Sequence, residues 1–87
     1  MAALSADVLQ DDMAVTLARV MAAANKHARE LGIDVVQSFI TITQQLDDGP
    51  NWRVNYGTRD YVNRRGGDLM IEVNGKDMKI KQVLRGQ

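Results

Sequence analysis

The feature that most constrains the fold is an alternation of side chains on both sides of an Asn-Gly pair. Branched aliphatic residues occupy every second position of residues 69–73, and Met78 and Ile80 alternate with lysines in residues 78–81. Asn74-Gly75 separates the two runs. Alternation with a period of two on both sides of an Asn-Gly turn is typical of a β-hairpin. We expect one face of this hairpin to be buried and the other to be exposed.

The length of the chain, 87 residues, predicts a single domain that spans residues 1–87. A domain of this size buries only about 60–65% of the surface that its unfolded chain exposes, so every large apolar side chain matters for stability. The sequence contains no cysteine, which excludes disulfide bonds, thiolate metal sites and cysteine nucleophiles. Stability must therefore come from packing or from association with a partner chain.

We do not expect the start of the chain to be a signal peptide. Residues 1–7 include no basic residue and no long apolar run, so they lack the features of a signal peptide. No segment approaches the roughly 20 consecutive apolar residues that a membrane-spanning helix requires. We therefore expect a cytoplasmic protein that does not associate with a membrane.

Residues 5–31 have the pattern of one amphipathic helix. Apolar residues recur at spacings of three and four along one stripe, namely Leu9, Met13, Leu17, Val20 or Met21, Ala24, Ala28 and Leu31. Acidic residues near the start and basic residues near the end suit the helix dipole. Gly32 is the expected stop, because glycine readily adopts the left-handed conformation. Ser5 and Asp11 remain alternative N-caps.

The segments after this helix have the features of β-strands, and they cover residues 33–46, 52–57, 68–73 and 78–84. Threonine, isoleucine and valine enrich the first of them, as is typical of extended structure. Residues 47–51 combine aspartate, glycine, proline and asparagine, which predicts a turn. Residues 57–67 are less regular, and the sequence leaves open whether they form an ordered loop or extend the second strand.

The order of these elements predicts an α+β domain in which one N-terminal helix packs on a four-stranded antiparallel meander sheet. Strands joined by short turns pair with their neighbours in sequence, and the helix is the element available to cover one sheet face. The face expected beneath the helix contains Val36, Ile40, Ile42, Trp52, Val54, Tyr56, Leu69, Ile71, Val73, Met78 and Ile80. The face expected to stay uncovered contains Phe39, Thr41, Thr43, Gln45, Arg53, Asn55, Met70, Glu72, Lys79 and Lys81.

The order of elements, with Trp-Arg-Val-Asn-Tyr at residues 52–56 and the closing segment at residues 68–80, resembles the cystatin-like α-β-β-β-β arrangement. Two bacterial families share this layout. The hairpin at residues 71–80 resembles that of PepSY-type domains, and the aromatic strand with its connection at residues 52–62 resembles small cytoplasmic toxin-immunity proteins. By fold-level analogy, both resemblances imply a non-enzymatic domain that binds or inhibits another protein.

The sequence contains no catalytic or metal-binding signature. The only histidine, His27, lies near the end of the expected helix, where a cation suits the helix dipole. The serines have no base nearby in sequence, and the adjacent aspartates do not have the spacing of a calcium loop. We therefore expect no enzyme activity, no bound metal and no cofactor.

The uncovered sheet face is the expected binding surface. We expect this face, or a sheet edge that accepts a further strand, to bind another protein or a second copy of the chain in a homodimer. The candidate contact residues are Phe39, Thr41, Arg53, Met70, Lys79, Lys81, Arg64 and Arg65.

Nucleic-acid binding is the alternative, because charge is distributed unevenly along the chain. The net charge is −4 in residues 1–50 and +4 in residues 51–87, and basic side chains on a sheet contact phosphates. Sheets that bind RNA usually also expose aromatic residues on which bases stack. Here Trp52 and Tyr56 are expected beneath the helix, which leaves Phe39 as the aromatic residue on the uncovered face.

Overall fold

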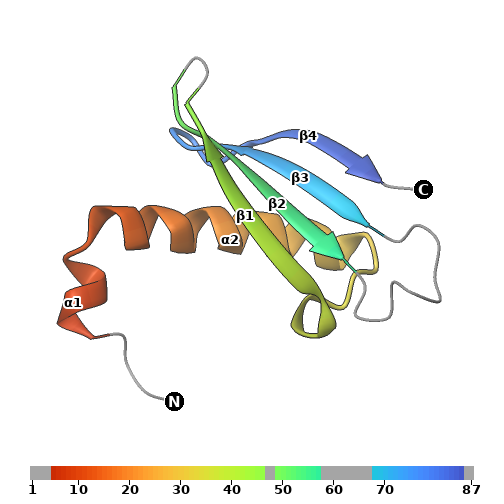
Figure 1. Cartoon of the computed structure of the whole chain (residues 1–87), viewed down its shortest axis with the longest axis horizontal. Helices are drawn as coiled ribbons and strands as arrows, with labels where there is room; N and C mark the ends of the chain where they lie inside the picture. The colour runs from red at the N-terminus through yellow and green to blue at the C-terminus, as the bar shows by residue number, and fades with distance from the viewer. Residues whose placement is uncertain (1–4, 47–48, 58–67, 86–87) are drawn as a thin grey trace.

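The computed structural model describes residues 5–46, 49–57 and 68–85. The helical elements are α1 (Ala6–Leu9), α2 (Asp12–Glu30) and the short 3-10 helix η1 (Val35–Gln37). The strands are β1 (Phe39–Gln45), β2 (Asn51–Gly57), β3 (Leu69–Asn74) and β4 (Ile80–Arg85). The strands form an antiparallel sheet in the order β1-β2-β3-β4, and α2 lies across one face of it (Figure 1). The predicted two-layer α+β meander is confirmed.

The expected helix over residues 5–31 is two helices. Gln10 ends α1, and the chain turns before α2 begins. Both candidate N-caps are used, because the Ser5 hydroxyl accepts a hydrogen bond from the Val8 N–H at 3.5 Å and the Asp11 carboxylate accepts one from the Ala14 N–H at 3.0 Å. Each cap satisfies a backbone donor that its own helix leaves free. The two N-cap signals therefore mark two helix starts.

The end of α2 agrees with the sequence. Gly32 has a φ of +87°, and its N–H donates to the Arg29 carbonyl at 3.0 Å, while the Ile33 N–H donates to the Ala28 carbonyl at 3.0 Å. This pair of bonds is the Schellman motif, which satisfies carbonyls at a helix end and requires a left-handed residue. Glycine adopts that conformation without the steric cost that a Cβ atom imposes.

Strand β1 starts later than the sequence pattern predicts. Asp34 caps η1 by accepting a hydrogen bond from the Gln37 N–H at 3.3 Å, so the chain coils before it becomes extended at Phe39. Val36, which alternation places beneath the helix, is 81% exposed as a result. Leu46, at the other end of the expected strand, is also exposed and lies outside β1. Local capping by a short polar side chain has overridden β propensity here.

The core lies between α2 and the helix-facing side of the sheet. Its buried members are Val20, Ala24, Ala28, Val35, Trp52, Val54, Tyr56, Leu69, Ile71 and Val73. The helix contributes mainly small residues, which allow its backbone to approach the sheet closely. Met78 and Ile80 pack against this cluster as predicted, although both are only partly buried. Most of the apolar face expected from alternation is therefore confirmed.

The β3–β4 hairpin exists, but its reversal differs from a two-residue Asn-Gly turn. The Asn74 carbonyl accepts from the Met78 N–H at 2.8 Å, and the residue with positive φ is Met78, at +61°. Gly75 has another role, because its N–H donates to the Pro50 carbonyl at 2.8 Å and a Cβ atom on it would lie 2.8 Å from that oxygen. Glycine is therefore required where the hairpin tip packs against the start of β2.

Candidate functional site

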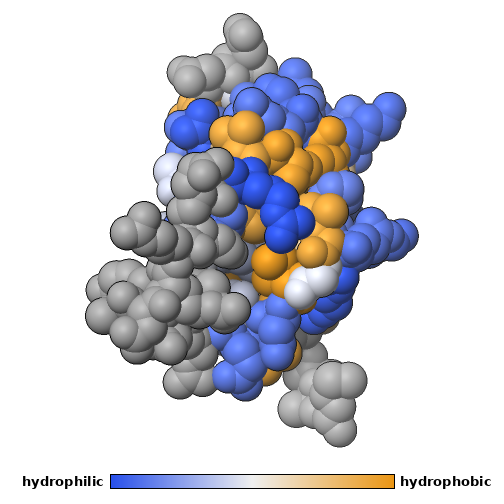
Figure 2. All heavy atoms as spheres, turned by 90° about the vertical axis from the view of Figure 1, so that its right-hand side faces the viewer, coloured by the Kyte–Doolittle hydropathy of each residue, from blue (hydrophilic) through white to orange (hydrophobic). Residues whose placement is uncertain are grey.

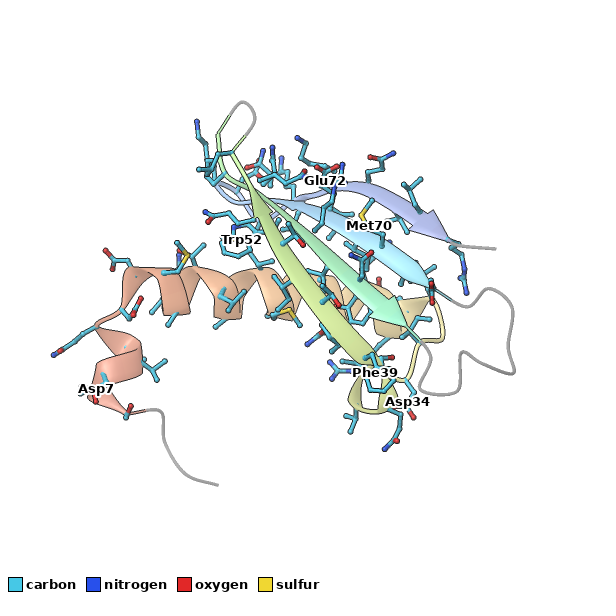
Figure 3. The ribbon with its side chains drawn as sticks, in the orientation of Figure 1. Asp7, Asp34, Phe39, Trp52, Met70 and Glu72 are labelled. Atoms are coloured by element: carbon cyan, nitrogen blue, oxygen red, sulfur yellow. The ribbon has the colours of Figure 1, made fainter. Side chains whose placement is uncertain are left out.

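The uncovered side of the sheet, which we call the open face, is defined by the strand register. In one row across the sheet, Thr41, Asn55, Met70 and Leu84 lie opposite one another in turn. The neighbouring row contains Thr43, Arg53, Glu72 and Gln82. Figure 3 shows Met70 and Glu72 along β3, and Phe39 at the start of β1. The face is apolar toward one end and polar toward the other.

The structure brings most of the predicted contact residues to this face. Phe39, Thr41 and Arg53 are exposed on β1 and β2, and Met70 is half-buried on β3. Lys81 is exposed on β4. The two remaining candidates in the basic segment, at positions 64 and 65, lie outside the described residues, and so does the connection at residues 58–67.

Lys79 does not lie on a strand, in contrast to the prediction. The strand β4 begins at Ile80, and Lys79 closes the preceding turn. Its N–H donates to the Asp77 carboxylate at 3.0 Å, and its carbonyl accepts from the Asn74 N–H at 2.9 Å. The turn is longer than alternation predicts, so residues 78 and 79, which were expected in the strand, precede β4.

A β-bulge places Gln82 and Leu84 on the open face, which sequence alternation does not predict. The β3–β4 pairing shifts between Glu72 and Val73, which lie opposite Gln82 and Ile80, so Lys81 is an extra residue. A shift of one residue moves every later position to the other face. Continued from Ile80, alternation assigns Leu84 to the buried side, whereas it is exposed and opposite Met70.

The cations of the open face are interspersed with other polar groups. Arg53 lies directly opposite Glu72 on β3, and opposite charges in such cross-strand positions attract. The Lys81 ammonium lies 3.3 Å from the Asn51 side-chain oxygen. Trp52 and Tyr56 are buried on the helix side. The described part of the face therefore lacks the combination of clustered cations and several exposed aromatics that is typical of RNA-binding sheets.

The free edge of β1 is the most unusual feature of the described surface. Within the described residues, β1 is paired only with β2, and its sequence, Phe-Ile-Thr-Ile-Thr-Gln-Gln, contains no charged residue and no proline. Phe39 is 57% exposed on the open face, and Ile40 is 37% exposed on the helix side. Edge strands usually contain charges or proline that prevent further pairing. This edge is chemically open to an additional strand.

The other sheet edge has different chemistry. Strand β4 contains Lys81 and Arg85 and has the bulge beside it, and these features discourage pairing with another strand. Figure 2 views the side of the molecule where the chain ends, and its hydrophobic surface is crossed and bordered by hydrophilic side chains. The two edges therefore differ, and β1 is the one available for strand addition.

The helix layer extends beyond the free edge of β1. In Figure 1, the N-terminal part of α2 continues past β1 and ends at α1, with no strand in front of it. We call residues 12–16 of α2 the overhang, because Leu17 is the first residue of this helix that packs against the core. Met13 on the overhang is 52% exposed, and Leu9 just before it is also exposed. The apolar stripe that the sequence predicts is therefore only partly covered.

Two polar side chains on β2 are buried beneath the sheet. The Tyr56 hydroxyl donates to the Asn25 side-chain oxygen at 2.7 Å. Burial raises the pKa of the Tyr56 hydroxyl to about 12, while the positive charge of Arg29 acts in the opposite direction. The Trp52 indole N–H has no acceptor among the described residues. Most buried polar groups have a partner, so the Trp52 indole is an exception in this core.

The pKa of Tyr56 predicts a loss of stability at alkaline pH. A pKa raised from 10 to about 12 on folding means that stability is complete below pH 10 and falls as the pH rises from 10 to 12, because the folded state holds the proton more tightly. Between about pH 9 and pH 11.5, we expect the free energy of unfolding of the native protein to fall by up to about 2 kcal/mol more than that of Tyr56→Phe, after allowance for solvent screening. Urea unfolding of both proteins across this range measures the difference, and equal losses would contradict the prediction.

The described residues contain no group of three or more histidine, aspartate or glutamate side chains placed to hold a metal ion. In the same residues, no helix combines the length and the apolar character needed to cross a membrane. The chain matches no model of a known protein family, no curated protein and no solved structure. A proposal about function must therefore come from the open face, the free edge of β1 and the overhang.

Proposed function

We propose that this chain is a non-enzymatic protein-interaction domain that binds its partner by strand addition at the free edge of β1. The observation that supports this most directly is an edge strand of seven residues that contains no charge and no proline and is paired on one side. A strand in this position presents unpaired backbone N–H and C=O groups to an incoming strand. Hydrogen bonds of the backbone then provide affinity.

Side chains on both faces of β1 can provide specificity. Alternate residues of a strand point to opposite faces, so a partner strand at this edge meets Phe39, Thr41 and Thr43 on the open face. On the helix side it meets Ile40 and the overhang of α2. Phe39 and Ile40 are partly exposed apolar residues beside the edge, and their contact with a partner removes apolar surface from water, which favours binding.

The cystatin-like order of elements is consistent with this proposal. The resemblance to PepSY-type domains and to small toxin-immunity proteins, noted from residues 52–62 and 71–80, implies binding or inhibition of another protein. An inhibitor or regulatory domain needs no catalytic residues of its own, only a surface that a partner recognises. This support is an analogy at the level of the fold, and the edge chemistry of β1 remains the main argument.

The test compares two lysine substitutions of exposed aliphatic residues. Ile40→Lys places an inward-pointing charge in the edge strand, which is a feature that blocks strand pairing in natural sheets. Val36→Lys is the matched control, since Val36 is 81% exposed on η1 and outside the sheet. Immobilised native protein, Ile40→Lys and Val36→Lys are incubated with lysate from the source cells, and retained proteins are quantified by mass spectrometry. We expect a partner that native protein and Val36→Lys retain and that Ile40→Lys loses at least tenfold.

Two other results would contradict this proposal. A partner retained equally by all three proteins would place the binding surface away from β1, and Arg53→Glu would then show whether the centre of the open face is responsible. Retention of nucleic acid at low salt, with affinity that falls steeply as salt increases, would favour the alternative function. Circular dichroism of each variant verifies that the fold is intact.

A further inference from the structure

We propose that the strand added at the free edge of β1 is β1 of a second copy of this chain, so that the protein is a twofold symmetric homodimer. This inference rests on the proposed function, because it names the partner of the same edge. In such a dimer the two β1 strands run antiparallel and join the two sheets into one. The same residues of both copies then face each other across the axis, as twofold symmetry requires.

The helix layer has room for a further strand. Leu17, the first residue of α2 that packs against the core, is four positions after Met13, and at about 1.5 Å per residue this distance is about 6 Å. Neighbouring strands are only about 4.8 Å apart. Figure 1 shows this part of α2 continuing past β1 on the side where the strand would be added. The strand layer is therefore at least one strand narrower than the helix layer.

Strand β1 is also complementary to a second copy of itself. An antiparallel copy places no charge opposite a like charge, because Phe39–Gln45 contains none. Threonine and isoleucine alternate at its centre, so threonines lie among threonines on one face and isoleucines among isoleucines on the other over most registers. Such β-branched pairs stabilise neighbouring strands.

Two apolar side chains beside this edge are exposed in a single copy. Ile40 and Met13 are exposed apolar side chains on the helix side of the edge, and the axis places both helix layers on the same side of the joined sheet. The overhang of each copy then lies beneath the strand of the other.

The required interface is compatible with the size of the chain. A stable interface buries about 800 Å² on each partner, which is roughly an eighth of the 6299 Å² that one copy exposes. In the proposed dimer each copy contributes its edge strand and its overhang, which adjoin each other in Figure 1. Pairing of the two β1 strands would also add apolar contacts to the small core between α2 and the sheet. A short chain without disulfide bonds gains stability from such association.

Light scattering after size exclusion, and sedimentation equilibrium over a range of concentrations, test the proposal. We expect native protein to have about twice the monomer mass of 9.7 kDa. Ile40→Lys on β1 and Met13→Glu on the overhang should each weaken dimerisation at least tenfold. Val36→Lys and Leu84→Lys, which replace exposed aliphatic residues elsewhere, should leave the mass unchanged. Met13→Glu keeps the test decisive if Ile40→Lys disturbs the sheet, because Met13 is 52% exposed on a helix.

The possible failures can be distinguished. If native protein is a monomer at every concentration, a second copy is excluded as the partner. The proposed function still stands in that case if immobilised native protein retains a different protein that Ile40→Lys does not retain. If neither a dimer nor such a protein is found, both proposals fail. A dimer that Leu84→Lys disrupts and Ile40→Lys does not would place the interface on the β4 side of the open face and overturn this inference.

Discussion

Replacement of Ile71 by alanine should destabilise the folded chain by about 2–5 kcal/mol. Ile71 is completely buried in the middle of β3, between Val54 on β2 and Val83 on β4. The loss combines the transfer free energy of the deleted methyl and methylene groups with the cost of the cavity that remains. Domains have only about 0.05–0.15 kcal/mol of stability per residue, so this change removes a large share of the total. Urea unfolding followed by circular dichroism measures it.

The neighbouring residue provides the control for this prediction. Met70 precedes Ile71 on the same strand but lies on the open face and is half-buried. Met70→Ala removes a side chain of similar size without leaving a closed cavity, so we expect a loss of about 1 kcal/mol or less. If Met70→Ala costs as much as Ile71→Ala, a second layer covers the open face. The prediction therefore tests the two-layer architecture as well as the core.

Replacement of Ala24 by leucine should also destabilise the fold, by about 1–3 kcal/mol. Ala24 is completely buried on the face of α2 that packs against the sheet. Leucine adds an isopropyl group where the helix lies close to the strands, so the helix must move outward or nearby side chains must adopt strained rotamers. The single tryptophan of the chain, Trp52, lies in the same core, and its fluorescence during urea unfolding reports the loss.

Ala22→Leu is the matched control, because Ala22 is exposed on the same helix. Alanine and leucine have nearly equal helix propensity, and exposed substitutions usually change stability by less than about 0.5 kcal/mol. Equal destabilisation by the two substitutions would mean that helix propensity, and not packing against the sheet, determines the effect. The same pair of variants also tests which side of α2 faces the sheet.

Much of the fold follows from local patterns in the sequence. The end of α2 is marked by Gly32, because a helix end needs a residue that accepts positive φ, and the structure confirms this at +87°. Alternation in residues 52–56 and 69–73 identifies the buried face of the two central strands, since both faces of a strand are set by its period of two. These features depend on neighbours along the chain, which a sequence displays directly.

Other features of the fold have no unambiguous signal in the sequence. The break after Gln10 and the late start of β1 result from caps by Asp11 and Asp34, and a short polar side chain in a sequence does not reveal whether it caps a helix. Gly75 was expected to provide a tight turn, whereas its lack of a Cβ atom allows contact with Pro50. The bulge at Lys81 likewise has no local marker.

The candidate site divides in the same way. The period-two pattern of the strands was sufficient to place Phe39, Thr41 and Arg53 on the open face. That β1 lies at a sheet edge follows from the meander order, and its lack of charge is visible in the amino-acid sequence.

The length of the overhang beyond that edge is a property of the tertiary structure alone, because it depends on the position and orientation of α2 against the sheet. Small core residues such as Ala24 and Ala28 permit close packing. The apolar pattern of the helix, however, continues unchanged beyond the edge strand β1. Only the arrangement of the two layers shows that Met13 has no strand above it.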